Sequence, residues 1–175
     1  MHPIIAKIGP FTIYSYGMMV AIAFLLGVSI AKLEAMRKNI KQDLIYDFSF
    51  YLIVGSIIGA RIYYIFFFVL IGFLIYTVFI FKVWQGGLSI HGGILGGVIT
   101  GLIFSKIRKI SFWKLADIIS PSIILGQAVG RIGCFLNGCC FGMPMEPFCG
   151  MKNHPTQIYE LILDFIGFLL LWNSR

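Results

Sequence analysis

The sequence predicts an all-α fold, a polytopic integral membrane helical bundle with about five transmembrane helices and an arm along the outer face. Three observations predict it. Of the 175 residues, 59% are hydrophobic and only 12% are charged. The mean hydropathy is +0.92. A soluble domain of this length needs a polar surface, and the chain has too few polar residues to cover one.

Apolar stretches long enough to cross a bilayer recur along the chain. A spanning helix needs about 20 mostly apolar residues. We expect helices at residues 11–31, 44–68, 88–105, 113–135 and 157–172. No internal repeat or linker is evident, so we predict a single membrane domain over residues 1–175.

The segment 69–84 is also apolar, and it is the predicted arm. The aromatic run at 66–68 and Trp84 are typical of a membrane interface. A single crossing within 44–81 places both clusters of basic residues on the same side of the membrane. A second crossing there would separate them, against the positive-inside tendency.

The net charge of +7 comes mainly from two short basic loops. Such clusters are typical of cytoplasmic loops, which we favour over nucleic-acid binding. The N-terminus is then expected outside, as is the loop 136–156. We see no removable signal peptide. The clusters consist of Lys32, Arg37, Lys38 and Lys41, and of Lys106, Arg108, Lys109 and Lys114.

Glycines recur at four-residue spacing in three predicted helices. Small residues at this spacing let helix backbones approach closely in lipid. Packing is therefore the expected role of most of them. They are Gly55 and Gly59; Gly93, Gly97 and Gly101; and Gly126 and Gly130.

Ionisable residues inside a bilayer are unfavourable and usually face a cavity or a partner. Arg61 either reaches the outer interface or contacts substrate. Asp117 either pairs with a basic neighbour or lies near the inner interface. Arg131 follows the uncharged stretch 118–130. Its guanidinium is suited to bidentate contact with a phosphate, and the alternative is an ion pair within the bundle.

His91 lies among glycines in GGLSIHGGILGG. A core histidine with satisfied hydrogen bonds is one interpretation. The other is catalytic, because Gly92 and Gly93 leave room beside the ring for a substrate, and a neutral imidazole can accept a proton.

All the cysteines fall within one predicted outer loop and the helix end before it. Thiols outside the cytoplasm oxidise, so one or two disulfides are the leading interpretation. Their pairing is open. A zinc site is an alternative, although the spacing lacks a C-x2-C pair, and a reactive thiol is another. The cysteines are Cys134, Cys139, Cys140 and Cys149.

Five motifs, in order, resemble those of bacterial prolipoprotein diacylglyceryl transferases. The resemblance runs from about residue 10 to 165. The HGG block and the GRIGxFxNG block together are specific, whereas either alone is weak. The motifs are YSYGMM, GARIYY, WQGGLSIHGGILGG, LADIISPSIILGQAVGRIGCFLNGCCFG and HPTQIYE.

The resemblance implies a multi-pass enzyme of the bacterial inner membrane. Its substrates would be phosphatidylglycerol and a preprolipoprotein signal peptide with a lipobox cysteine. Glycerol phosphate would leave, and no metal or organic cofactor is implied. His91 matches the essential histidine and Arg131 the arginine that binds the lipid phosphate. Asn137 and Tyr16 match signature residues, and Gly92 and Arg61 lie in motifs that would line the substrate site.

The chain departs from the family pattern at two places. The common signature reads GRIGNFxNGE, and here Cys134 and Cys139 replace the asparagine and the glutamate. The cysteines resemble those of a GCFxxGCC subgroup. The family also continues into another helix with a second essential arginine, so we expect this chain to be C-terminally shortened.

Two further function classes are open from the sequence. A divergent relative could act in thiol-redox chemistry through Cys139 and Cys140. A channel or transporter is disfavoured because polar residues gather towards one face instead of recurring along several helices.

Overall fold

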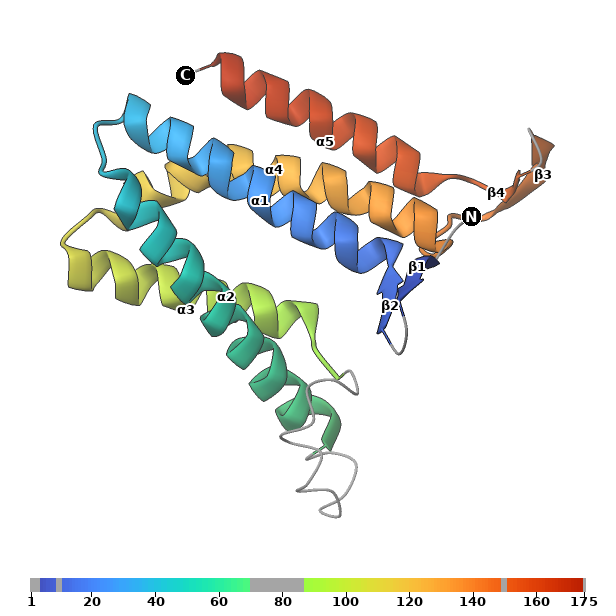
Figure 1. Ribbon diagram of the computed structural model, residues 1–175, viewed down its shortest axis with the longest axis horizontal. Helices are drawn as coiled ribbons and strands as arrows, with labels where there is room; N and C mark the ends of the chain where they lie inside the picture. Colours follow the sequence, from blue (N-terminus) through green and yellow to red (C-terminus); the bar gives the residue numbers. More distant parts are fainter. Residues whose placement is uncertain (1–3, 9–10, 70–86, 149–150, 175) are drawn as a thin grey trace. The chain divides into compact units, whose positions relative to one another are not determined.

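Five helices and two short hairpins make up the part of the chain that the computed structural model describes, residues 4–8, 11–69, 87–148 and 151–174 (Figure 1). The expected all-helical membrane architecture is confirmed. The helices are α1 (Ser15–Arg37), α2 (Gln42–Tyr64), α3 (Ile90–Arg108), α4 (Phe112–Asn137) and α5 (Thr156–Asn173). The π-helical turn η1 (Ile65–Val69) continues α2. The strands are β1 (Ile4–Ile8), β2 (Phe11–Tyr14), β3 (Pro144–Phe148) and β4 (Met151–Asn153).

Four of the described helices are long and apolar enough to cross a membrane: α1, α2 extended to Phe67, α3 and α4. The fifth expected span corresponds to α5, which is not among the four. Its first turns carry Gln157, Glu160 and Asp164, which lower its hydropathy. Residues 70–84 of the predicted arm lie outside the described residues.

The first helix begins later than expected, at Ser15 instead of residue 11. Residues Phe11–Tyr14 form strand β2, which pairs antiparallel with β1. Thr12 and Ile13 are β-branched and favour a strand. Hydropathy does not distinguish such a strand from the first turn of an apolar helix.

The described chain divides into two compact units, one of residues 1–38 and 117–175 and the other of residues 39–116. The single domain expected from the sequence stays a prediction.

Glycines join α2 to α3 in the unit of residues 39–116. A Cβ on Gly59 would lie 2.5 Å from the Gly92 carbonyl oxygen and 2.7 Å from the Gly96 Cα, so the two backbones are in contact. The glycine repeat of α2 therefore serves packing, as expected. On α3, the closest approach is made by Gly92 and Gly96. A Cβ on Gly93 would find only ordinary contacts, at 3.8 Å.

The other end of α2 and α3 is held by aromatic and charged contacts. The rings of Phe48 and Phe104 lie 5.2 Å apart between centroids, and both side chains are buried. Beyond them, Arg108 forms an ion pair of 2.5 Å with Asp47. A hollow of about 380 Å³ lies beside this pair, among residues 39–47 and Ile110.

Helices α1 and α5 both pack along α4 in the other unit (Figure 1). A Cβ on Gly27 of α1 would lie 3.5 Å from the Ser122 carbonyl oxygen, and one on Gly167 of α5 would lie 3.8 Å from Ile124. The guanidinium of Arg37 lies 3.9 Å from the ring centroid of Trp172. Asp117 forms an ion pair with a basic neighbour, Lys38, which is one of the two expected arrangements.

A buried proline lies inside α4, and the residue before it compensates for the missing hydrogen bond. Pro121 has no N–H to donate to the carbonyl of Asp117, one turn earlier. The Ser120 hydroxyl donates to that carbonyl at 3.1 Å. Side-chain compensation of this kind is how helices in membranes tolerate proline.

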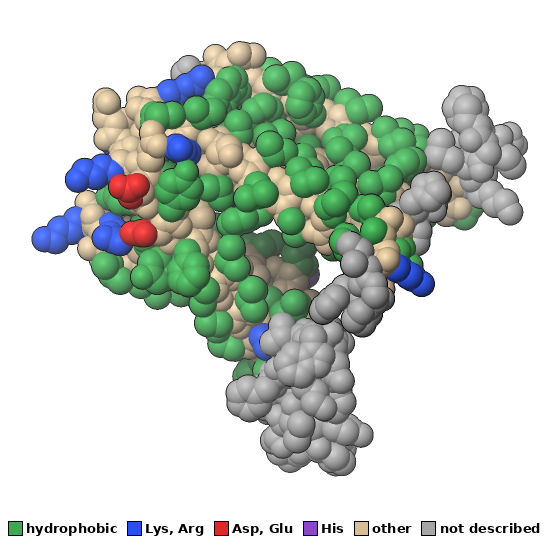
Figure 2. Space-filling view, viewed as in Figure 1, with side chains coloured by type: hydrophobic (Ala, Val, Ile, Leu, Met, Phe, Trp, Pro, Cys, Tyr) green, Lys and Arg blue, Asp and Glu red, His purple; other side chains and the backbone are tan. Residues whose placement is uncertain are grey.

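Hydrophobic side chains cover much of the face shown in Figure 2. Large apolar residues are exposed along the helices, for example Leu25 at 65%, Ile94 at 61% and Leu163 at 66%. Exposed apolar surface of this extent is unfavourable in water and matches the hydrocarbon of a bilayer.

Candidate functional site

His91 lies exposed in the first turn of α3. Its ring stacks near Tyr63, with centroids 6.1 Å apart and an interplanar angle of 24°. Tyr63 stacks in turn on Phe67 at 4.4 Å. The imidazole thus lies beside one aromatic ring and is exposed, so a reactant can reach it, which would not be true of a buried core histidine.

Arg61 holds the segment that leads into His91. Its Nη1 donates to the carbonyl oxygen of Gly87 at 2.9 Å. The backbone N–H of Ser89, the N-cap of α3, donates to the carbonyl of Ala60 at 3.2 Å. Gly87 has φ of +77° and a Cβ there would lie 2.8 Å from the guanidinium. Arg61, near the end of α2, therefore contacts the backbone of Gly87 just before α3, an arrangement that the sequence did not predict.

Gly92, expected beside a substrate, is buried against α2. A Cβ there would collide with the carbonyl oxygen of Gly59 and would lie 2.9 Å from the Cα of Ala60. The space on this side of the residue is filled by helix backbone.

Arg131 lies on α4 and forms an ion pair with Glu160 of α5. The side chains are 28% and 41% exposed, respectively. This is the bundle ion pair that the sequence left open. Because a guanidinium has several N–H donors in a planar fork, a single carboxylate leaves donors for a second anion.

Tyr16 lies on α1, close to the helix that carries Arg131. A Cβ on Gly133 would lie 3.4 Å from Cδ2 of the Tyr16 ring. Gly133 is buried, whereas the Tyr16 side chain is 46% exposed. The absence of a side chain at Gly133 thus lets α1 approach α4 beside the arginine.

Asn137 ends α4, and the two residues after it form a Schellman motif. The N–H of Gly138 donates to the carbonyl of Phe135, and that of Cys139 to the carbonyl of Cys134, both at 3.2 Å. Gly138 has φ of +74°, the left-handed conformation that this motif requires and that glycine adopts without strain. The motif places Cys139 directly over Cys134.

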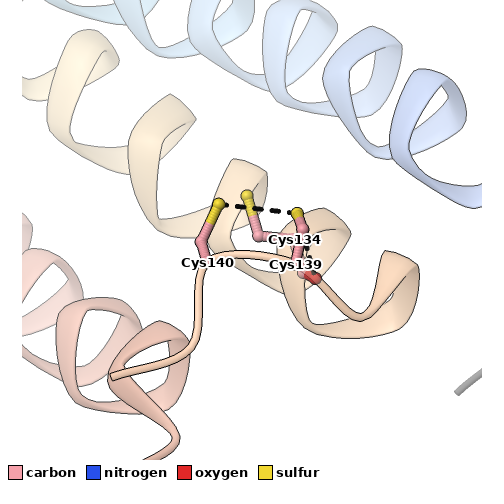
Figure 3. Close-up of side chains that lie close together, drawn as sticks. All are labelled: Cys134, Cys139 and Cys140. Carbon is pink, nitrogen blue, oxygen red and sulfur yellow. Dashed lines mark hydrogen bonds between the residues drawn. The ribbon is translucent and has the colours of Figure 1, made fainter. Parts of the chain in front are cut away.

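Three of the four expected disulfide cysteines are free thiols in the structure: Cys134, Cys139 and Cys140. Cys149 lies outside the described residues. The thiol of Cys140 donates to the sulfur of Cys139 at 3.5 Å (Figure 3). Disulfide pairing therefore stays a prediction.

The hydrogen bonds between the thiols shift the pKa values of Cys139 and Cys140 in opposite directions. Burial raises the pKa of the Cys139 thiol, but hydrogen bonds from Cys140, Asn137 and Cys134 oppose it and leave that pKa below its ordinary value. The hydrogen bond to Cys139, together with burial, raises the pKa of Cys140 to about 11.

The start of α5 fixes the cysteine loop, which the sequence did not predict. Thr156 Oγ1 donates to the carbonyl of Cys140 at 2.8 Å, and Gln157 Nε2 donates to that of Cys139 at 2.5 Å. Asn153 Nδ2 donates to the carbonyl of Gly142 at 3.1 Å. The HPTQIYE motif, which holds Thr156 and Gln157, is the sequence signal that could have pointed to their contacts, and Asn153 lies directly before it.

The expected site residues fall into two groups. Arg61, His91 and Gly92 belong to the unit of residues 39–116, whereas Tyr16, Arg131 and Asn137 belong to the other, together with the described cysteines. Within each group the residues lie on neighbouring elements. The convergence of His91 and Arg131 on one substrate stays a prediction.

The sequence is similar to that of known proteins over almost its whole length. Residues 3–175 match the family model described as prolipoprotein diacylglyceryl transferase. Similar proteins include the phosphatidylglycerol–prolipoprotein diacylglyceryl transferases of Trichormus variabilis, 40% identical over 184 residues, and Oceanobacillus iheyensis, 41% identical over 191 residues. That of Fusobacterium nucleatum is 37% identical over 222 residues.

Each alignment covers almost all of this chain but a smaller share of the relative. They include 97%, 94% and 98% of this chain, but 65%, 65% and 76% of the Trichormus, Oceanobacillus and Fusobacterium proteins. The chain therefore spans about two thirds of the length of these curated relatives.

Proposed function

The chain belongs to the prolipoprotein diacylglyceryl transferase family, and from this we propose that it transfers the diacylglyceryl group of phosphatidylglycerol to the lipobox cysteine of a preprolipoprotein. The observation that carries the proposal is the family match over residues 3–175, which includes both His91 and Arg131.

The proposed reaction replaces a carbon–oxygen bond by a carbon–sulfur bond. The peptide thiol loses its proton, and the thiolate attacks the diacylglyceryl carbon that bears the phosphate. The bond from that carbon to the phosphate oxygen breaks, and glycerol phosphate leaves with the electron pair. No oxidant or reductant is needed. A thiolate is the nucleophilic form of cysteine, so a base beside the thiol accelerates the attack.

His91 is proposed as the base that takes the thiol proton. Its exposure at the start of α3 supports this role, because a base must come within hydrogen-bond reach of its substrate. Arg61 is proposed to position it, through the carbonyl of Gly87 just before the helix.

Arg131 is proposed to bind the phosphate of the lipid and to stabilise the negative charge on the leaving group. Its partial exposure supports access to a head group. Tyr16 and Asn137 are proposed to contact the same lipid, Tyr16 from the start of α1 and Asn137 from the end of α4.

We further propose that the chain lies in the bacterial inner membrane with its N-terminus outside. The basic residues at the ends of α1 and α3 support this orientation, because loops 38–41 and 109–111 then lie on the cytoplasmic side. In a chain whose four native cysteines are replaced by serine, cysteine introduced at Lys41 should resist a membrane-impermeant maleimide in intact cells, while cysteine at Lys7 should react. Labelling at position 41 but not at position 7 would contradict the proposed orientation.

A direct assay tests the transfer. The 175-residue chain is reconstituted in vesicles that contain phosphatidylglycerol labelled in its diacylglyceryl group, and a lipobox peptide is added. We expect label on the peptide cysteine. Arg131→Ala and His91→Asn should abolish it, whereas Lys106→Ala, which removes an exposed charge at the far end of α3, should not.

Two outcomes would contradict the proposal. Absence of label on the peptide from the unmodified chain would contradict the activity. Full labelling by the Arg131→Ala variant would contradict the assigned residue. Insertion of each variant is checked by its recovery in the membrane fraction.

A further inference from the structure

Three cysteine sulfurs lie close together at the end of α4, and the proposed transfer reaction assigns them no role. The Sγ atoms of Cys134, Cys139 and Cys140 all lie within 4.8 Å of one another. Figure 3 shows them close together on the same side of the turn. Cys134 and Cys139 are half-buried and Cys140 is exposed, so the cluster is open to solutes on one side.

The backbone holds the three thiols in place. The Schellman motif fixes Cys139 over Cys134 through the hydrogen bond of 3.2 Å between their main chains. Cys140 follows with φ of +66°, which turns the chain back towards the helix end. Thr156 and Gln157 then bind the carbonyls of Cys140 and Cys139. Ligand groups that are already assembled lose little conformational entropy when an ion binds.

The spacing of the sulfurs fits a metal–thiolate site. Metal–sulfur bonds of about 2.3 Å to three thiolates place the sulfurs about 4 Å apart. The pair Cys139 and Cys140 is at 3.5 Å and the whole cluster lies within 4.8 Å. Small side-chain rotations are therefore enough to bring all three onto one ion.

The charges nearby also favour such a site. Three thiolates repel one another, and a bound cation offsets that repulsion. Arg131 lies one turn before Cys134 on α4, the spacing at which helical side chains are neighbours. Its guanidinium, which is also paired with Glu160, would offset part of the excess negative charge of a tris-thiolate complex.

We propose that Cys134, Cys139 and Cys140 bind one thiophilic metal ion, Cu⁺ or Zn²⁺. Soft thiolate ligands select these ions over harder ones. Each thiol gives up its proton on binding, so three sulfur–hydrogen bonds are replaced by three metal–sulfur bonds and the protons pass to the solvent. The oxidation state of the metal does not change.

Cu⁺ and Zn²⁺ differ in the number of ligands that they require. Cu⁺ is satisfied by three soft ligands, whereas Zn²⁺ takes a fourth. Within the described part of the chain, no further histidine, cysteine or carboxylate joins the cluster. Zn²⁺ would therefore keep a water at its open position and exchange more readily.

Metal uptake by the reduced chain in detergent tests the proposal. The protein is dialysed against Zn²⁺ in one arm and Cu⁺ in the other, and bound metal is counted by mass spectrometry of the elements. We expect about one ion per chain in at least one arm. Serine at all three positions should abolish uptake, and serine at any single one should weaken it by about 100-fold or more.

Cys149→Ser removes the remaining cysteine of the chain, which lies outside the described residues, and so tests whether three thiols are enough. We expect it to bind metal like the unmodified chain. Loss of binding in this variant, or equal binding by the triple serine variant, would overturn the three-thiolate site. A disulfide between Cys139 and Cys140 that persists under reduction and prevents metal uptake would also overturn it.

A second measurement needs no variant and so does not depend on folding of the serine proteins. Bound metal should protect the three clustered thiols from alkylation, as mapped by peptide mass spectrometry. Unchanged alkylation of all three in the metal-loaded chain would overturn the proposal. Activity does not enter either readout, so this inference stands or falls separately from the transferase proposal.

Discussion

The guanidinium of Arg131 on α4 forms an ion pair with the carboxylate of Glu160 on α5. The cation that we assign to the lipid phosphate thus already has an anionic partner from a neighbouring helix. The carboxylate occupies some of the guanidinium donors and offsets part of its charge, so it would compete with the phosphate that we propose binds the remaining donors.

This competition predicts the effect of Glu160→Gln. The glutamine keeps the size of the side chain and removes its charge, so Arg131 should bind an anionic head group more tightly, with Kd lowered by about tenfold, or about 1.4 kcal/mol. Titration of the purified variant with a fluorescent phosphatidylglycerol measures it. Glu160→Asp, which keeps the charge, is the control, and weaker binding by Glu160→Gln would contradict the competition.

The contact between α2 and α3 predicts that Gly59→Ala is destabilising. The new methyl group would meet the backbone of Gly92 and Gly96, so the helices must separate. The expected loss is about 1–3 kcal/mol, typical of overpacking. Thermal unfolding in detergent reports it. Gly93→Ala, whose methyl group finds ordinary contacts at 3.8 Å, should unfold close to the unmodified temperature.

The left-handed residue just after α4 predicts the effect of Gly138→Ala. An L-residue at φ of +74° is strained by about 1–2 kcal/mol. Gly138→Asn should lose less, because asparagine tolerates this conformation. Gly130→Ala is a control within the same helix, with no atom within 4 Å of the added carbon. Equal unfolding temperatures for all three variants would rule out the strain.

The hydrogen bond between the adjacent thiols predicts a pH dependence of alkylation. The pKa of Cys139 lies below its ordinary value and that of Cys140 is about 11. The thiolate is the reactive form, so as pH rises Cys139 should react before Cys140. Peptide mass spectrometry after timed iodoacetamide treatment measures both rates.

Variants at Cys140 check the cause of that order. Cys140→Ala removes the donor to Cys139, so the pKa of Cys139 should rise and its alkylation at neutral pH should slow. Cys140→Ser keeps a hydroxyl donor and should retain the faster rate. Faster alkylation of Cys139 in the alanine variant would show that the hydrogen bond has the opposite effect.

The helices could be predicted from hydropathy because membrane spans are long and almost uniformly apolar. The span expected at residues 113–135 corresponds to α4, Phe112–Asn137. The span expected at residues 44–68 corresponds to α2 together with its π-helical turn. The hairpins could not. Strand β2 continues directly into α1 without a polar break, and its identity depends on pairing with β1.

The glycines of α3 show what the four-residue spacing cannot predict, namely which pair of glycines packs against α2. Both Gly92 with Gly96 and Gly93 with Gly97 have the four-residue spacing, and only the position of α2 decides which pair packs most closely. In the same way, His91 and Arg131 could be found from motifs. The partner of Arg131 could not, because Glu160 reaches it from a helix 29 positions further along the chain.

The turn after α4 also changes how the departures from the family signature should be understood. The main-chain hydrogen bond between positions 139 and 134 joins these two positions whatever their side chains are. The asparagine and glutamate of the common signature would stand at these same two positions. The two departures from the signature therefore fall on neighbouring positions of one turn and exchange a polar pair for a pair of thiols.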